Sequence, residues 1–165
     1  MNGLEHIEIG LYRGSPGRSP DIVAQALRAA GDTADRSISS LHAYLVRPSD
    51  PTTPVLYRVE RTGDLTRGVT AQQHGKAILT MTASYQQVGN PSPSDPSAAV
   101  YASHHEHGLD YAVWFHAPLR TDDRLRYEQH RIWTGRSRVL CHGSLFDPSG
   151  LLVATIAQES FYEAG

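Results

Sequence analysis

The chain has 165 residues, and its 15 basic and 17 acidic side chains give a net charge of −2. This length suits one domain or two very small ones, and 39% hydrophobic with 19% charged residues indicates a chain that buries a core. Duplex binding needs a basic field that this composition lacks, and no apolar run approaches the roughly 20 residues that cross a bilayer. We therefore expect neither nucleic acid nor a membrane as partner, and the N-terminus MNGLEHIEIG is not typical of a signal peptide.

Cysteine and histidine usage bears on metals and on location. Cys141 is the only cysteine, which excludes an intrachain disulfide and a Cys-based zinc site and fits the cytoplasmic location that we predict. His104, His105 and His107 surround Glu106, a grouping that suggests metal binding. The grouping follows a Pro/Ser-rich stretch and lacks the helical i, i+4 spacing of a zinc pair. We favour a solvated loop, with no metal and no cofactor.

The N-terminal third predicts a strand and then a helix. Ile7, Ile9 and Leu11 alternate with polar residues, which is typical of a half-buried strand. Ser19 is a candidate N-cap with Pro20 at the first helical position. The apolar positions that follow recur at three- and four-residue steps up to a stop at Gly31. So wide an apolar face predicts a helix wrapped by a sheet.

The remainder predicts strands separated by turn residues and one linker. The expected strands are residues 37–47, 54–62, 66–73, 76–87, 108–116, 124–133, 136–146 and 151–162. Residues 88–103 contain three Pro and four Ser and predict a linker or long crossover without a helix. The sequence thus predicts about nine strands and one central helix.

The two sets of strands resemble each other. Leu41-His42 corresponds to Leu109-Asp110, and Tyr57 corresponds to Tyr127. We interpret this as a degenerate duplication. The expected domains are a first repeat at 1–87 with the helix, a linker at 88–104, and a second, partial repeat of strands at 105–165.

Polar residues inside apolar strands are the candidates for chemistry, because no nucleophile elbow, phosphate loop or dinucleotide fingerprint is present. Asp110 in GLDYAVWFH is either a base at the mouth of a pocket or an ordinary strand-end cap. Gln158 ends LLVATIA, where its amide either bonds an edge backbone or orients water or a carbonyl. From the residues alone, both alternatives remain open at each position.

These segments carry a family resemblance. SSLHAYLVRPSDPTTPVLYRVERT, QHGKAILTMTAS, GLDYAVWFHAPLRTDD and LLVATIAQES resemble the acyl-CoA thioesterase II family. The resemblance implies an α+β hotdog fold, in which a long antiparallel sheet wraps a central helix. It also implies hydrolysis of acyl-CoA to free acid and CoA, a reaction of lipid metabolism. The family's catalytic Asp and Gln match Asp110 and Gln158.

Two departures separate the chain from this family pattern. The hydroxyl position that helps to hold the attacking water is Ile132 here, and Thr134 is the nearest hydroxyl. Ser19-Pro20-Asp21 replaces the family's Gly-Gly-Gln at the helix start, and Pro20 has no N–H to donate. The chain is also shorter than its relatives.

We predict that Asp110, Gln158 and Thr134 form the catalytic set, and that Ile132 lies near Asp110. His42, Tyr111, Trp114 and Ile132 are the predicted substrate-binding residues, with His42 at the position equivalent to Asp110. The alternatives are a non-hydrolytic hotdog that binds an acyl or polyketide-like ligand, and a hotdog dehydratase or cyclase. We also expect a homodimer or higher homo-oligomer, because a sheet without its second helix exposes an apolar face or edge.

Overall fold

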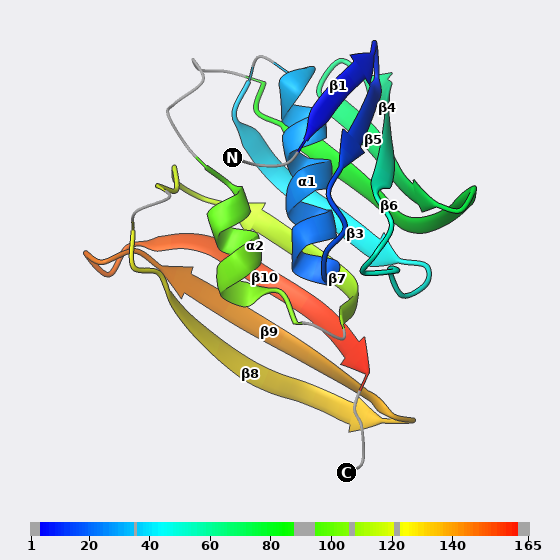
Figure 1. Ribbon diagram of the computed structural model, residues 1–165. Helices are drawn as coiled ribbons and strands as arrows, with labels where there is room; N and C mark the ends of the chain where they lie inside the picture. Colours follow the sequence, from blue (N-terminus) through cyan, green and yellow to red (C-terminus); the bar gives the residue numbers. More distant parts are fainter. Residues whose placement is uncertain (1–3, 35, 88–94, 106–107, 121–122, 162–165) are drawn as a thin grey trace.

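The computed structural model describes residues 4–34, 36–87, 95–105, 108–120 and 123–161, and these form one curved antiparallel sheet with two helices on one face (Figure 1). The strand order is β1-β2-β4-β5-β6-β3-β7-β10-β9-β8. The helices are α1 (Ser19–Asp32) and α2 (Ser97–Ser103). The strands are β1 (Glu5–Glu8), β2 (Leu11–Gly14), β3 (Ile38–Leu45), β4 (Val55–Gly63), β5 (Thr66–Gln73), β6 (Lys76–Tyr85), β7 (Gly108–Phe115), β8 (Arg126–Gly135), β9 (Arg138–Phe146) and β10 (Leu152–Phe161). The predicted α+β architecture is confirmed.

The sheet has the same order in both halves when it is followed outward from its centre. β3 pairs with β7 in the middle of the sheet. Outward from β3 the order is β6, β5 and β4, and outward from β7 it is β10, β9 and β8, so each half runs in reverse chain order after its first strand. The first half continues into the β2 and β1 strands. Among the described residues nothing pairs with the outer edge of β8.

One core lies between the two helices and the sheet, and its largest part is packed between α1 and the first half of the sheet. Ile22, Val23 and Leu27 are buried, and the alanines of α1 let the sheet approach the helix closely. The helix begins one residue earlier than predicted, since Arg18 is the N-cap and its N–H donates to Asp21 Oδ2 at 3.0 Å. Gly31 lies inside the helix, and Thr33 is the C-cap.

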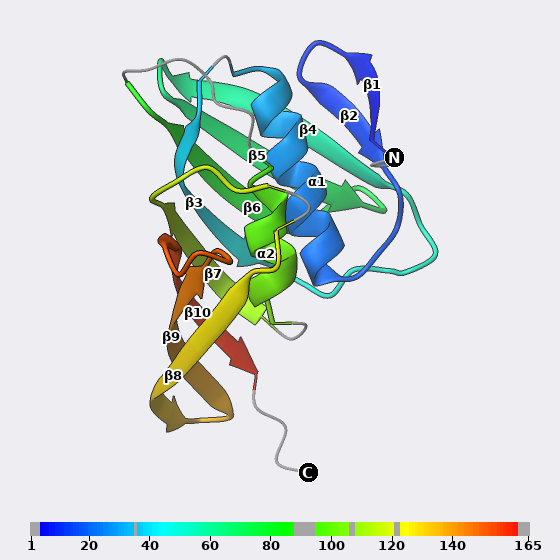
Figure 2. The same cartoon turned by 90° about the vertical axis from the view of Figure 1, so that its left-hand side faces the viewer.

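The predicted linker contains a helix, which corrects the expectation that the second half has none. α2 packs beside α1 on the same face of the sheet (Figure 2). Tyr101 Oη donates to Asp21 Oδ1 at 3.0 Å, and Arg28 donates to Ser97 Oγ at 3.3 Å. Buried Ala99 and Val100 supply the apolar contact. Residues 88–94 of the predicted linker, and Glu106 and His107, lie outside the described residues.

The predicted N-terminal strand is also wrong in detail, because it is a hairpin. Gly10 has a φ of +75°, a conformation that favours glycine, and its carbonyl accepts a 2.8 Å bond from the Val59 amide. β1 is exposed along its whole length, and Ile9 is 99% exposed. The alternation therefore spans two short strands, and the sheet has ten strands instead of nine.

Candidate functional site

The sheet register places the two main candidates on opposite faces. Asp110 pairs with Glu159, whereas Gln158 pairs with Tyr111. Directly paired residues share a face and successive residues alternate. Tyr111 and Gln158 are buried at 1% and 3% exposure on the helix face, so Asp110 faces the side without helices. The structure does not bring Asp110 and Gln158 together.

On the helix-free face, Asp110 meets His42. His42 Nε2 lies 2.5 Å from Asp110 Oδ1, and the two side chains are 61% and 47% exposed. His42 lies on β3 and Asp110 on β7, the two central strands of the sheet. Because these equivalent strands of the two repeats pair directly, the corresponding positions His42 and Asp110 lie close to each other. The pair is therefore open to water and fixed by the rigid middle of the sheet.

A hollow of about 260 Å³ lies beside this pair. Its walls include His42, Tyr44, Thr80 and Thr82. Thr82 is the direct β6 neighbour of His42 in the register. The hollow is thus lined by His42 of the pair, by hydroxyl donors and by the carboxylate of Glu60, while Asp110 lies outside its lining. A His–Asp pair can move a proton, and hydroxyl donors can bind an oxyanion.

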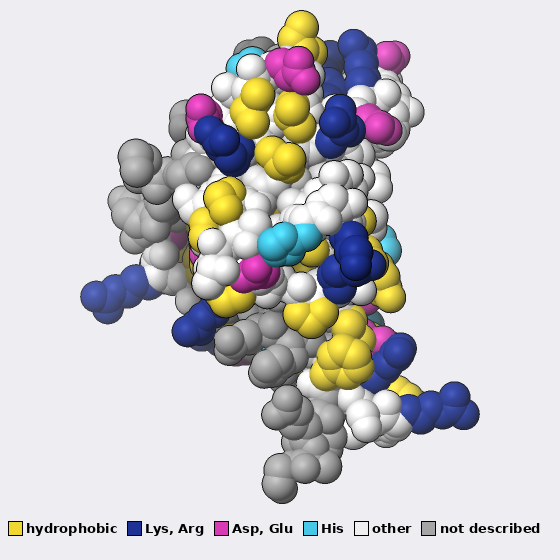
Figure 3. Space-filling model, turned by 45° about the vertical axis from the view of Figure 1, so that its right-hand side comes forward, with side chains coloured by type: hydrophobic (Ala, Val, Ile, Leu, Met, Phe, Trp, Pro, Cys, Tyr) yellow, Lys and Arg dark blue, Asp and Glu magenta, His cyan; other side chains and the backbone are white. Residues whose placement is uncertain are grey.

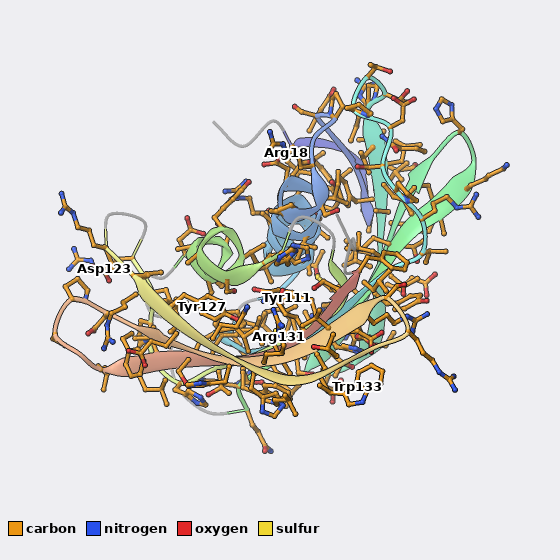
Figure 4. The ribbon with its side chains drawn as sticks, turned by 90° about the horizontal axis from the view of Figure 1, so that it is seen from below. Arg18, Tyr111, Asp123, Tyr127, Arg131 and Trp133 are labelled. Atoms are coloured by element: carbon orange, nitrogen blue, oxygen red, sulfur yellow. The ribbon has the colours of Figure 1, made fainter. Side chains whose placement is uncertain are left out.

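On the helix face, Gln158 is the centre of a polar network beneath α2. Gln158 Nε2 donates to the Ser103 carbonyl at 2.8 Å and to Tyr127 Oη at 3.1 Å, and its Oε1 accepts from the His105 amide at 3.0 Å. Tyr111 and Tyr127 both lie between the helices and the sheet (Figure 4). Gln158 therefore holds the C-terminal end of α2 on β10, and its amide has no vacant donor directed at Asp110.

Tyr127 reaches Gln158 only because residue 143 is glycine. A Cβ at Gly143 would lie 2.2 Å from the Tyr127 ring. Burial raises the pKa of Tyr127, while its bond to Gln158 lowers it by less. The phenol thus stays neutral and serves as a hydrogen-bonding group.

His104 is buried beside this network without a hydrogen-bond partner. Its ring is 4.5 Å from the Tyr111 ring in an edge-on contact, and among the described residues neither ring nitrogen has a partner. Burial, followed by the charge of neighbouring His105, lowers the pKa of His104 to about 4. His104 is therefore a neutral core residue, where the sequence predicted a solvated loop.

The remaining predicted site residues are scattered. Trp114 is on the helix-free face at 46% exposure. Ile132 and Thr134 lie on β8, and two strands, β10 and β9, separate β8 from β7. Three strand spacings amount to about 14 Å, and Ile132 occupies an irregularity in the β8–β9 pairing at 50% exposure. The expected proximity of Ile132 to Asp110 is wrong in this structure.

Sequence reasoning missed Ser103, Tyr127 and Thr82. Ser103 lies in a stretch that the sequence assigned to a linker. The segment SAAVYAS, which contains Ala99 and Val100, is only a weak indication of a helix. Thr82 belongs to no motif, and only the strand register shows that it lies beside His42.

In the described part of the chain, no group of three or more His, Cys, Asp or Glu could hold a metal ion. No described helix is both long and apolar enough to span a membrane.

Solved structures share this architecture. An acyl-CoA thioesterase II, TesB2, from Mycobacterium marinum is 28% identical, with a TM-score of 0.82 over 98% of this chain and 96% of that one. A tesB protein from Mycobacterium avium subs paratuberculosis has a TM-score of 0.85 at 23% identity, also over 98% and 96%. The fold is that of the hotdog thioesterases, as the resemblance implied.

A family model described as the acyl-CoA thioesterase C-terminal domain matches residues 3–162, and the chain belongs to this family. Acyl-coenzyme A thioesterase 8 of Rattus norvegicus and of Homo sapiens are each 28% identical, over 274 and 272 positions that cover 94% of this chain and 85% of the relative. These alignments are longer than the chain, so they include positions that this chain lacks.

Proposed function

We propose that the protein hydrolyses an acyl-CoA thioester to a free acid and CoA. Support comes from the family and from relatives named acyl-coenzyme A thioesterase 8. The single observation that carries the proposal is the 2.5 Å contact between His42 and Asp110 on the open face of the sheet. It provides a fixed, water-accessible proton acceptor.

The reaction uses water as the nucleophile. The His42–Asp110 pair accepts a proton from water, either at the free Asp110 oxygen or at His42 Nδ1, as the water oxygen bonds to the thioester carbonyl carbon. The resulting oxyanion accepts a hydrogen bond from a hydroxyl of the hollow, for which Thr82 is the nearest in register to His42. The carbon–sulfur bond then breaks, and the CoA thiolate leaves and takes up the proton.

Gln158 has a different role in this proposal from the one the resemblance implies. Its amide is occupied by Ser103, His105 and Tyr127 on the helix face. We propose that it acts as a positioning residue, which keeps α2 and β10 in register and leaves water activation to Asp110. Thr134 on β8 is proposed to take no part.

A thiol-release assay across acyl-CoA chain lengths tests the function. Asp110→Asn should lower kcat by about 100-fold or more, the range for loss of a general base, and His42→Ala should lower it similarly. Asp64→Asn is the matched control, because Asp64 is 96% exposed in a distant turn. Full activity of Asp110→Asn would show that the reaction occurs elsewhere.

A non-hydrolytic acyl-binding protein is the second candidate. The observation in its favour is the separation of β8 from β7, because no hydroxyl of β8 lies near Asp110 to position water. Saturable binding of acyl-CoA without thiol release, at every chain length, would favour this candidate over the enzyme.

We also propose that the chain forms a homodimer. α2 has seven residues where α1 has fourteen, so the second half of the sheet is covered less. The outer edge of β8 pairs with nothing among the described residues, and Ile132, Trp133 and Phe161 are each about half exposed nearby. Hydrophobic patches also lie between charged groups on the face shown in Figure 3. Sedimentation should give a dimer at tens of micromolar, and a clean monomer would contradict this.

A cytoplasmic location stays a prediction from the single cysteine, Cys141.

A further inference from the structure

A second cavity of the described structure is distant from both candidate sites. It has a volume of about 410 Å³ and lies where the C-terminal end of α1 meets the start of β3 and the ends of β6 and β7. Phe115 on its wall is five residues along β7 from Asp110, which corresponds to about 17 Å, and it faces the helix side of the sheet. The cavity is therefore separate from the His42–Asp110 pair.

The cavity has an apolar floor and a polar rim. Leu27, Tyr85 and Phe115 form the buried floor, and each is less than 10% exposed. Arg36 and His116 are exposed at the rim. The volume is in the range of small-molecule sites. The cavity surface is about equally polar and apolar, which suits a ligand with an apolar part and a polar end.

The charge of the rim selects the class of ligand. Arg36 is cationic, and no described residue that lines the cavity is acidic. Of the described acids near the cavity lining along the chain, Asp32 accepts from Tyr12 and Asp95 accepts from Ser97. An anion at this rim thus meets the guanidinium of Arg36, and no described lining residue carries a competing carboxylate.

Arg36 is held in place by the neighbouring strand end. Its Nη1 donates to the Gln87 carbonyl, and among the described residues it makes no other hydrogen bond. No described residue accepts from its Nε–Nη2 edge, and this edge of a guanidinium fits the two oxygens of a carboxylate.

We propose that this cavity binds a small hydrophobic carboxylate, such as a medium-chain fatty acid, with the chain on Leu27 and Phe115 and the carboxylate at Arg36. The proposed hydrolysis releases an acid of this class, but the binding does not depend on that activity.

Fluorescence titration with 11-(dansylamino)undecanoate, and with its methyl ester as the uncharged probe, tests the proposal. The wild-type protein should bind one equivalent of the acid, at least threefold more tightly than the ester. Arg36→Gln should weaken acid binding about three- to tenfold, the effect of one lost hydrogen-bonding pair, and leave ester binding unchanged. Arg58→Gln, an equal charge change on an exposed β4 position, should have no effect.

Gly31→Leu is a second, independent variant. Gly31 lines the cavity, and a Cβ there would meet no atom within 4 Å, so leucine suits the helix and reduces the free volume. It should weaken both probes at least threefold. Asp110→Asn should bind both probes like the wild-type protein, whatever its effect on thiol release. Equal affinity of the acid for wild type, Arg36→Gln and Gly31→Leu would overturn the proposal, as would no binding at all.

Discussion

The buried His104 predicts that the fold is unusually sensitive to mild acid. His104 is 9% exposed, neither ring nitrogen has a hydrogen-bond partner among the described residues, and burial lowers its pKa to about 4 in the folded protein. An unfolded chain binds the proton with a pKa near 6.5. Between these values the unfolded state holds more protons, so stability is complete above about pH 6.5 and falls as the pH drops toward 4.

The two pKa values give the size of this effect. At pH 4.5, close to the folded value, His104 alone lowers the free energy of unfolding by about 2–3 kcal/mol relative to pH 8. Urea denaturation of the wild-type protein and of His104→Phe at both pH values measures it. The variant should lose about 2–3 kcal/mol less stability than the wild-type protein on acidification.

A matched control separates this residue from general acid effects. His130→Phe changes an exposed histidine of β8 and should leave the acid sensitivity of the wild-type protein unaltered. If His104→Phe and the wild-type protein lose equal stability between pH 8 and pH 4.5, His104 is not a buried neutral group and the packing of α2 described above is incorrect.

Two further substitutions test the packing. Gly143→Ala places a methyl group where Tyr127 lies and should cost about 1–3 kcal/mol by overpacking; an unchanged urea midpoint would mean that Tyr127 lies elsewhere. Arg67→Met should cost at least about 2 kcal/mol, because the buried guanidinium donates to the carbonyls of Thr33, Gly63 and Thr66 and would leave them unpaired. Arg58→Met changes an exposed position of β4 and should have the urea midpoint of the wild-type protein. An equal shift of the urea midpoint in both arginine variants would contradict the role of Arg67 in binding these carbonyls.

The strands were predictable because turn residues separate them and alternation marks many of them. β3 and β9 each expose every second side chain over most of their length, and that pattern is visible in the sequence. α1 was predictable from its apolar spacing. α2 was not, because seven residues give too short a period to distinguish a helix from an irregular segment next to proline.

The site was only partly predictable, because motifs give residues but not register. The equivalence of His42 and Asp110 in the two repeats was visible, yet their contact depends on β3 pairing directly with β7. Asp110 and Gln158 lie on opposite faces because Gln158 of β10 pairs with Tyr111 of β7. A shift of one residue in this pairing would place Gln158 on the same face as Asp110. Ile132 was displaced for a similar reason, since two strands lie between β7 and β8.

The central claim is that water is activated at the His42–Asp110 pair on the helix-free face. The most direct test is the kcat of thiol release by purified Asp110→Asn, relative to wild type, with a Gln158→Ala variant measured in parallel at a temperature where circular dichroism shows both variants to be folded. We predict a loss of about 100-fold or more for Asp110→Asn and a loss of less than about tenfold for Gln158→Ala, whose side chain lies on the other face of the sheet. Wild-type activity in Asp110→Asn, or a larger loss in Gln158→Ala, would contradict the account.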